Sequence, residues 1–492
     1  MGILSKVEDR PTPSQVYNWR VYLCSIVAGF AAVMIGYDSA FIGTTIALPS
    51  FKKEFNFAAL STSKLNLLSA NIVSCYQAGA FWGALFAYVA AYWLGRVKGM
   101  ALFSAVFTLG AGMMLGTNGD RGLGLIYGGR ALAGIGMFEL GWQIGGLVGF
   151  WINYGVAQTL APNSKQWIIP FAIQLVPSGL LFIGTLWLHE TPRWLMSRGK
   201  KEKAIRNLCW IRSLTEDDIY IKEEIYAIEQ NIEQQMIGGG LGFWQPFKLL
   251  ASNRKFQWRF FLGGSLFFWQ NASGINAINY YSPTIFKSIG IIGTNTSLFS
   301  TGLFGVVKTV GTFLYLLFLI DQLGRRKLLM IGSIGGAFIY SSTFWRICCL
   351  LLLLMDCILY SNLEPYTPWV INAEIFDQSV RTLAQAHAAA HNWFWNFLIS
   401  RFTPQMFTSM GYGVYLFFAS LMIWEQHLFF SSSLKRKNVP LEAIDRLFDR
   451  NLPARKAHAI VWVELEQEEE ALRAGITAGL EKGVASSHVE KV

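Results

Sequence analysis

Two ionisable side chains of opposite charge lie inside long apolar stretches of the sequence. Asp38 falls within the apolar run 21–48, and Arg130 falls within the run 122–137. A charged side chain inside a membrane span costs at least ~2.5 kcal/mol, so its presence there points to a function. We therefore predict that Asp38 and Arg130 form an intramembrane pair, which a proton or an anionic solute opens and closes. The alternative is that one of the two reaches the membrane interface along its stem.

Amide side chains form a second polar group within apolar sequence. Gln270, Asn271 and Asn276 occur on one predicted span, at a spacing that brings Gln270 and Asn276 to similar faces. Amides can replace the water around the hydroxyls of a polyhydroxylated solute, and aromatic rings can stack on its apolar face. The set therefore indicates a binding site. The alternative is that these amides only join one helix to another.

Lys308 lies in the apolar segment 305–309 and could recognise a charged solute. A buried ammonium needs an anionic or strongly polar partner. A carboxylate on a polyhydroxylated ring would supply that partner, while the amides bind the ring hydroxyls. The alternatives are that Lys308 pairs with Glu139 or extends to the interface.

The composition indicates which elements position these residues. Of the 492 residues, 53% are hydrophobic and only 15% are charged. The apolar residues occur in blocks, and about 20 of them as a helix cross a bilayer. The net charge of +10 comes from Lys and Arg clustered between the blocks, as in cytoplasmic loops, so no nucleic-acid partner is expected. The sequence contains no phosphate-binding glycine loop, HExxH motif or nucleophile triad. We therefore predict that the protein is not an enzyme and has no cofactor or metal site.

The blocks predict an all-α membrane protein with two six-helix halves, nominally of twelve transmembrane helices, of which the fourth, the ninth and tenth, and the twelfth are irregular. The predicted regions are a cytoplasmic N-terminus (1–20), an N-terminal transmembrane half (21–188), a cytoplasmic central loop (189–258), a C-terminal transmembrane half (259–430) and a cytoplasmic tail (431–492). The predicted spans are 21–48, 67–94, 99–117, 122–137, 138–157, 167–188, 259–286, 297–320, 328–345, 347–375, 388–409 and 412–430.

The two halves repeat a short turn after their second span. The first copy is 95–98 (GRVK), and the second is 321–327 (DQLGRRK). Glycine permits a tight turn, and cations near helix C-termini are favoured by the helix dipole. Repeated halves around a shared central site are typical of secondary transporters. The turns, the central loop and both termini are therefore expected to face the cytoplasm.

These motifs resemble the sugar-porter branch of the major facilitator superfamily. The resemblance rests on GYD at 36–38, ETPRW at 190–194, QNASGIN at 270–276 with a following YY, and PW at 368–369. Several stretches, such as MIGYDSAFIGTT, ELGWQIGGLVGFWINYG and ISRFTPQMF, are further similar to fungal quinate permeases. The resemblance implies a multi-pass carrier in the cell membrane that imports quinate as a carbon source by proton symport. The alternatives are a proton-coupled hexose or polyol transporter and a nutrient sensor that does not transport.

The resemblance also implies roles for individual residues. Asp38 and Arg130 would couple transport to protons, and cytoplasmic lysines are candidate sites for ubiquitin-dependent turnover. The expected partners are a small solute, protons and membrane lipid. The candidate substrate-binding residues are Glu139, Gln270, Asn271, Asn276, Lys308, Trp369 and Asn396. Glu139 stands where the family usually has Gln. The candidate residues of a cytoplasmic salt-bridge gate, which would hold the halves together when the carrier faces outward, are Glu190, Arg193, Arg325, Arg326, Glu374 and Arg381.

Three segments depart from the family pattern and indicate internal deletions. Between 135 and 139 the fourth span passes directly into the fifth, without the expected cytoplasmic turn. The loop expected within 343–363 and the closing motif expected at 431–433 are also missing. The run 122–157 could cross once as a single long helix, which would invert everything after it. Alternatively, the chain reverses tightly at 134–136 with half of the fourth span absent.

Overall fold

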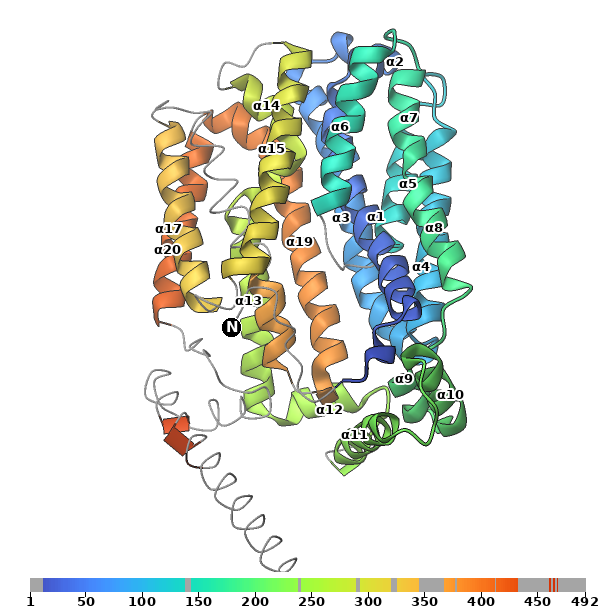
Figure 1. The fold of residues 1–492 in the computed structure, drawn as a ribbon. Helices are drawn as coiled ribbons and strands as arrows, with labels where there is room; N and C mark the ends of the chain where they lie inside the picture. Colours follow the sequence, from blue (N-terminus) through green and yellow to red (C-terminus); the bar gives the residue numbers. More distant parts are fainter. Residues whose placement is uncertain are drawn as a thin grey trace, which may run out of the picture.

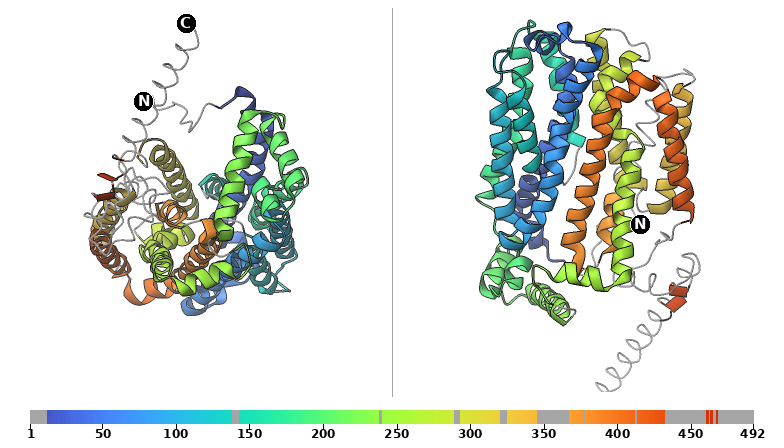
Figure 2. Two further views of the ribbon diagram at one scale, coloured as in Figure 1. Left: turned by 90° about the horizontal axis from the view of Figure 1, so that it is seen from below. Right: turned by 180° about the vertical axis from the view of Figure 1, so that it is seen from behind.

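The fold is a bundle of long helices in two groups, seen in a computed structural model (Figure 1). The structure describes residues 12–137, 143–237, 240–288, 293–319, 325–344, 367–376, 378–411 and 413–431, and a few residues between 460 and 467. All regular secondary structure in these ranges is helical. Seen from below, the first group of helices lies beside the second, and the view from behind shows the central segment at the lower end (Figure 2).

The first group contains the helices from the blue to the green part of the chain (Figure 1). The side chain of Asn18 caps the first of them by accepting hydrogen bonds from Arg20 N at 2.8 Å and Val21 N at 3.4 Å. The helices are α1 (Trp19–Ala47), α2 (Pro49–Glu54), α3 (Thr62–Trp93), α4 (Arg96–Leu115), α5 (Gly124–Ile135), α6 (Gln143–Thr159), α7 (Lys165–Ile173) and α8 (Leu175–Thr185), with short turns η1 (Ser14–Val16) and η2 (Phe57–Ala59).

The second group begins after a central segment of short helices at the lower end in Figure 1. Residues 367–375 are also helical and precede α19. The central helices are α9 (Pro192–Ser197), α10 (Lys201–Arg212), α11 (Ile219–Ile237) and α12 (Gln245–Ser252). The second group contains α13 (Arg254–Ala272), α14 (Ile275–Ser288), α15 (Thr294–Leu314), the π-helical turn η3 (Tyr315–Leu319), α17 (Arg325–Phe344), α19 (Gln378–Met410) and α20 (Gly413–Ser431).

Five helical segments in the described ranges are long and apolar enough to cross a membrane. These are Ser14–Ala47, Thr62–Trp93, Arg96–Leu115, Lys165–Thr185 and Thr294–Leu314. They agree with the prediction of several membrane spans. The count of twelve stays a prediction, partly because most of the predicted tenth span lies outside the described residues.

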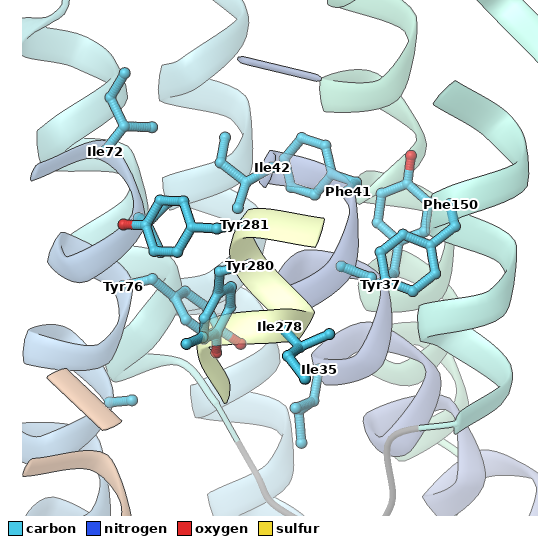
Figure 3. Packing of buried hydrophobic residues seen from close by; sticks show 14 of the residues in the cluster. Ile35, Tyr37, Phe41, Ile42, Ile72, Tyr76, Phe150, Ile278, Tyr280 and Tyr281 are labelled. Atoms are coloured by element: carbon cyan, nitrogen blue, oxygen red, sulfur yellow. The ribbon is translucent and has the colours of Figure 1, made fainter. Parts of the chain in front are cut away.

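Helices of the two groups meet along the centre of the bundle. The helix α3 packs along α19, and α1 and α6 contact α14 and α15 respectively. The contact between α1 and α14 is backbone to backbone, since a Cβ added to Gly43 would lie 1.9 Å from the carbonyl oxygen of Tyr280. Tyr280 and Tyr281 share one buried cluster with Phe41 and Tyr76 (Figure 3). The two groups are therefore closed against each other in the upper half of the bundle.

Glycines account for two sharp changes in chain direction. Gly95 has φ +92 and joins α3 to α4, which confirms the tight turn predicted for the first repeat. Gly274 has φ +82 and separates α13 from α14. A Cβ there would lie 2.7 Å from the ring of Phe418, so only glycine fits this break. The corresponding turn at 321–324 lies outside the described residues.

The helices α5 and α6 are both too short to cross a bilayer. Their 12 and 17 residues would span roughly 18 and 25 Å, against a hydrocarbon core of about 30 Å. The helix α6 occupies only the upper half of the bundle (Figure 1). The helix α5 ends near the middle of α3, where a Cβ on Gly134 would lie 2.1 Å from Tyr76 O. The chain therefore reverses between two half-height helices, as in the second sequence-based alternative, rather than crossing once.

The half-height of α6 leaves one face of α1 uncovered. Gly145 of α6 contacts the backbone of Val33 in the middle of α1. Towards the lower end, the same face continues through Gly29, Ile26 and Tyr22 at helical spacing. Ile26 and Tyr22 are each 59% exposed, and a Cβ on Gly29 would meet nothing within 4 Å. This face lies where a full-length α6 would continue.

Candidate functional site

The structure brings Asp38 and Arg130 together in the interior of the first group. Arg130 Nη1 lies 3.3 Å from both Oδ1 and Oδ2 of Asp38, and both side chains are fully buried. The Arg130 guanidinium also lies over the ring of Tyr76, with its Cζ 4.9 Å from the centroid. Within the described part of the chain, Arg130 Nε and Nη2 have no hydrogen-bond partner. The predicted contact is therefore present, although the coupling role assigned to it stays a prediction.

The distance between the charged atoms is long for a buried ion pair, and the guanidinium is incompletely hydrogen bonded. Breaking a buried ion pair by removing one partner typically costs about 3–5 kcal/mol, because the other charge is left uncompensated. Protonation of Asp38 would have a similar local effect, since it removes the charge that Arg130 faces. Such a pair can therefore link proton binding to a rearrangement of α1 and α5.

The amides of the second group form a continuous hydrogen-bonded row. Asn271 Nδ2 donates to Asn392 Oδ1 at 3.0 Å, and Asn276 Nδ2 donates to Asn271 Oδ1 at 2.7 Å. Asn279 Nδ2 donates to Asn276 Oδ1 at 3.4 Å, and Lys308 Nζ donates to Asn279 Oδ1 at 3.0 Å. We call these five residues the amide row. It joins α19, α13, α14 and α15.

Two members of the amide row were not predicted from the sequence. Asn279 lies three residues after Asn276, and Asn392 lies four residues before Asn396, spacings that place each pair on one helical face. Periodicity could therefore have found both residues. Gln270 is buried beside the row, and Asn276 donates its hydrogen bond to Asn271 Oδ1. The predicted alignment of Gln270 with Asn276 assumed a continuous helix, which Gly274 interrupts.

The other predicted binding residues surround the amide row. Trp369 packs on Phe267 of α13, with ring centroids 4.4 Å apart. Asn396 Oδ1 accepts a hydrogen bond from Ser400 Oγ at 3.1 Å, and Gln77 Nε2 of α3 donates to the same hydroxyl at 3.4 Å. Asn396 thus belongs to a contact between the two groups of helices. Glu139 lies outside the described residues, so its predicted pairing with Lys308 is not described.

Two of the predicted gate residues, Glu190 and Arg381, bind backbone groups at the lower end of the bundle. Glu190 accepts hydrogen bonds from the backbone N–H of Arg96 at 2.9 Å and of Val97 at 3.2 Å, which caps α4. Arg381 donates from Nε and Nη2 to the carbonyl of Phe376 at 3.1 and 3.0 Å. Among the described residues, neither of these two side chains makes the proposed contact between halves.

Arg193 of the central helix α9 lies near enough to Arg381 of α19 for their charges to interact. Desolvation and the charge of Arg381 lower the pKa of Arg193 below its ordinary value. Glu374 lies on the helix 367–375. The side chains of Arg325 and Arg326 lie outside the described set, so the gate as a whole stays a prediction.

The fold and this interior site define a multi-pass membrane transporter of the major facilitator type. The sugar (and other) transporter family model matches residues 24–138 and 135–448, and the chain belongs to this family. Members of the family are transporters, so the prediction that the chain is not an enzyme is confirmed.

Full-length relatives agree with this assignment. The chain is 54% identical over 536 residues to a "Probable quinate permease" of Aspergillus fumigatus, covering 100% of this chain and 99% of that protein. It is also 54% identical over 540 residues to the "Quinate permease" of Emericella nidulans, covering 100% of both chains.

Solved structures show the same fold. The proton:xylose symporter XylE bound to 6-bromo-6-deoxy-D-glucose matches with a TM-score of 0.70 and 23% identity, over 87% of this chain and 99% of that one. The inward-open form of XylE from E. coli gives a TM-score of 0.67 with 22% identity, over 86% and 99% of the two chains. The predicted major facilitator fold is therefore confirmed.

The comparisons also support the predicted internal deletions. The alignment with the Aspergillus fumigatus relative spans 536 positions, which is 44 more than the 492 residues of this chain. The family match is divided at residues 135–138, between α5 and α6. The relatives therefore carry residues that this chain lacks, and the break in the family match coincides with the mid-bundle reversal.

Proposed function

We propose that the chain is a proton-coupled importer of quinate in the cell membrane. The observation that carries this proposal is the buried Lys308 ammonium at one end of the amide row. Lys308 donates to the neutral amide of Asn279, and a buried ammonium beside amides can attract a carboxylate. The amides and the indole of Trp369 suit the hydroxyls and apolar face of the same ring. The names of the relatives support this choice of solute.

Proton coupling is assigned to Asp38 and Arg130. When Asp38 is charged, it holds Arg130 between α1 and α5. When Asp38 is protonated, Arg130 is released and the helices of the first group can move relative to the second. The contact between α1 and α14 at Gly43 lies one to two helical turns from Asp38. A shift of α1 would therefore disturb the contact between the two groups in the upper half of the bundle.

The topology follows from the charge distribution. We place the central helices α9–α12, the gate residues and both termini on the cytoplasmic side. The proposed regions remain 1–20, 21–188, 189–258, 259–430 and 431–492, with lysines of the cytoplasmic regions as sites for ubiquitin-dependent turnover. Membrane lipid surrounds the two transmembrane halves.

Uptake of labelled quinate and labelled glucose, in cells that lack their own carriers, tests the proposal. The chain as given and a version with the missing segments restored are compared at equal surface expression. Uptake of quinate that exceeds uptake of glucose and rises with an inward proton gradient supports the proposal. Preferred uptake of glucose would favour the hexose transporter instead.

A sensor that binds the solute without transporting it is the second candidate. The half-height helices α5 and α6 favour it, because they remove the lower part of two spans that should move during transport. Binding of quinate without uptake by the chain as given, even with normal surface expression, would support this candidate.

A further inference from the structure

The hydrogen bonds of the amide row all run in one direction. Each amide donates through Nδ2 to the oxygen of the residue further from Lys308 and accepts through Oδ1 from the residue nearer to it. An amide has separate donor and acceptor ends, so reversing one member would place two donors or two acceptors against each other. The orientations of Asn276 and Asn279 therefore depend on their neighbours, whereas Asn271 Nδ2 also donates to the backbone carbonyl of Phe267 at 2.8 Å.

Lys308 fixes the direction of the row at one end. An ammonium has three donors and no acceptor, so Asn279 must turn its oxygen towards Lys308. The Asn279 Nδ2 then faces Asn276 Oδ1, while at the other end Asn271 presents its Oδ1 to Asn276, so Asn276 is fixed from both sides. Lys308 and Asn279 are each only 3% exposed, so water cannot readily supply a substitute partner.

We infer that Asn279 is a positioning residue through which Lys308, together with Asn271 on the other side, sets the hydrogen-bond orientation of the candidate substrate-binding residue Asn276. Asn276 is the only partly exposed amide among the five residues of the row. It is therefore the member best placed to meet a solute hydroxyl, and its orientation decides whether it offers a donor or an acceptor. This inference rests on the proposed function and adds a second role to Lys308, beside attraction of a carboxylate.

The inference predicts a pattern that simple charge recognition does not. If Lys308 only attracted a carboxylate, its replacement would leave binding of a neutral analogue unchanged. If it also orients the amides, a neutral analogue should be affected as well. The matched pair of ligands is quinate and quinamide, which share the ring hydroxyls and differ in the charge of the carboxyl group.

The test is a double-mutant cycle with Lys308→Met and Asn279→Leu, measured as equilibrium binding of both ligands to the purified full chain. Either substitution alone should weaken quinamide binding by roughly threefold to tenfold, the value of one neutral hydrogen bond. The double variant should lose no more quinamide affinity than either single variant, because both break the same row. Quinate should lose at least about 30-fold with Lys308→Met.

Two further variants separate orientation from packing. Asn279→Asp is nearly isosteric and still accepts from Lys308, but it cannot donate to Asn276, so the loss of quinamide binding should persist. Asn153→Asp changes a buried amide that bonds Thr45 and the Phe41 carbonyl, outside the row, and should leave the ratio of quinamide to quinate affinity unchanged.

The outcomes distinguish the inference from the proposed function. Additive effects on quinamide, or full quinamide binding by Asn279→Asp, would overturn the inference while leaving quinate binding in place. Failure of the unaltered chain to bind either ligand would overturn both. Each variant is compared only if it elutes as a single species with the helical content of the parent chain.

Discussion

Arg130 Nη1 lies equally far, 3.3 Å, from the two carboxylate oxygens of Asp38, while neither side chain has any exposed surface. The two charges come from α1 and α5, and the remaining nitrogen atoms of the guanidinium have no hydrogen-bond partner among the described residues. The pair is thus held mainly by charge. Removing the charge of Asp38, by a proton or by substitution, should release Arg130.

The first prediction concerns Asp38→Asn. The neutral amide should abolish uphill accumulation of quinate, because no proton can then be taken up at this position. Exchange of quinate across the membrane should persist. The measurement is accumulation and counterflow in vesicles with and without a pH gradient. A variant that still concentrates quinate in response to the gradient would show that coupling resides elsewhere.

The second prediction concerns the charge of Lys308. Lys308→Asn should weaken quinate uptake by about 2–5 kcal/mol of binding free energy if the ammonium is desolvated in the complex. Uptake of a neutral polyol should fall much less, because only the orientation of the amides is disturbed. Initial rates over a range of concentrations give the comparison. Equal losses for both solutes would assign Lys308 a purely structural role.

The third prediction concerns the contact between Gly43 and Tyr280. A side chain at Gly43 must displace the backbone of α14, since its Cβ would lie 1.9 Å from a carbonyl oxygen. Gly43→Leu should therefore prevent closure of the upper half at a cost of about 1–3 kcal/mol. The distance between spin labels at Asn56 and Thr296 should increase.

Gly29→Leu is the matched control for this experiment, because a Cβ at Gly29 of the same helix meets nothing within 4 Å. The spin-label distance should not change in the control. An unchanged distance in Gly43→Leu, with transport intact, would contradict the closure assigned to α1 and α14.

The fourth prediction is that the chain as given transports poorly. Restoring the residues that relatives carry at the α5–α6 junction, with the missing loop and closing motif, should rescue surface expression and uptake. A cysteine at Ile26 should become protected from a membrane-permeant reagent, because the uncovered face of α1 is then filled. Cysteines introduced within 195–205 should stay inaccessible from outside the cell.

Robust transport by the unrepaired chain, with 195–205 inaccessible from outside, would show that the deletions have little effect. Labelling of 195–205 from outside would instead support the single-crossing topology, against the reversal seen in the structure.

Several features of the fold could be predicted because they depend on local sequence. The apolar blocks predicted the long helices, and glycine at position 95 predicted the turn between α3 and α4. The opposite charges of Asp38 and Arg130 were sufficient to predict their contact, since an unpaired charge in an apolar interior is costly.

Other features depend on tertiary contacts that the sequence does not specify. The break at Gly274 redirects Asn276 towards Asn271, and so changes which amides meet. Asn279 shares a helical face with Asn276 in the sequence, but its contact with Lys308 of α15 depends on how α14 and α15 pack. Glu190 was expected to form a salt bridge between the two halves, but it accepts a hydrogen bond from the first N–H group of α4. Similarly, the choice between one crossing and a reversal after α5 depended on packing against α3 and α1.

Equilibrium binding of labelled quinate to the purified chain tests the proposed substrate site itself, because the amide row lies on helices of the second group. We expect saturable binding of quinate that quinamide displaces only weakly and glucose more weakly still. We also expect loss of the preference for quinate over quinamide in Lys308→Asn. Equal affinity for quinate and quinamide in the unaltered chain, or a preference that survives Lys308→Asn, would contradict the proposed site.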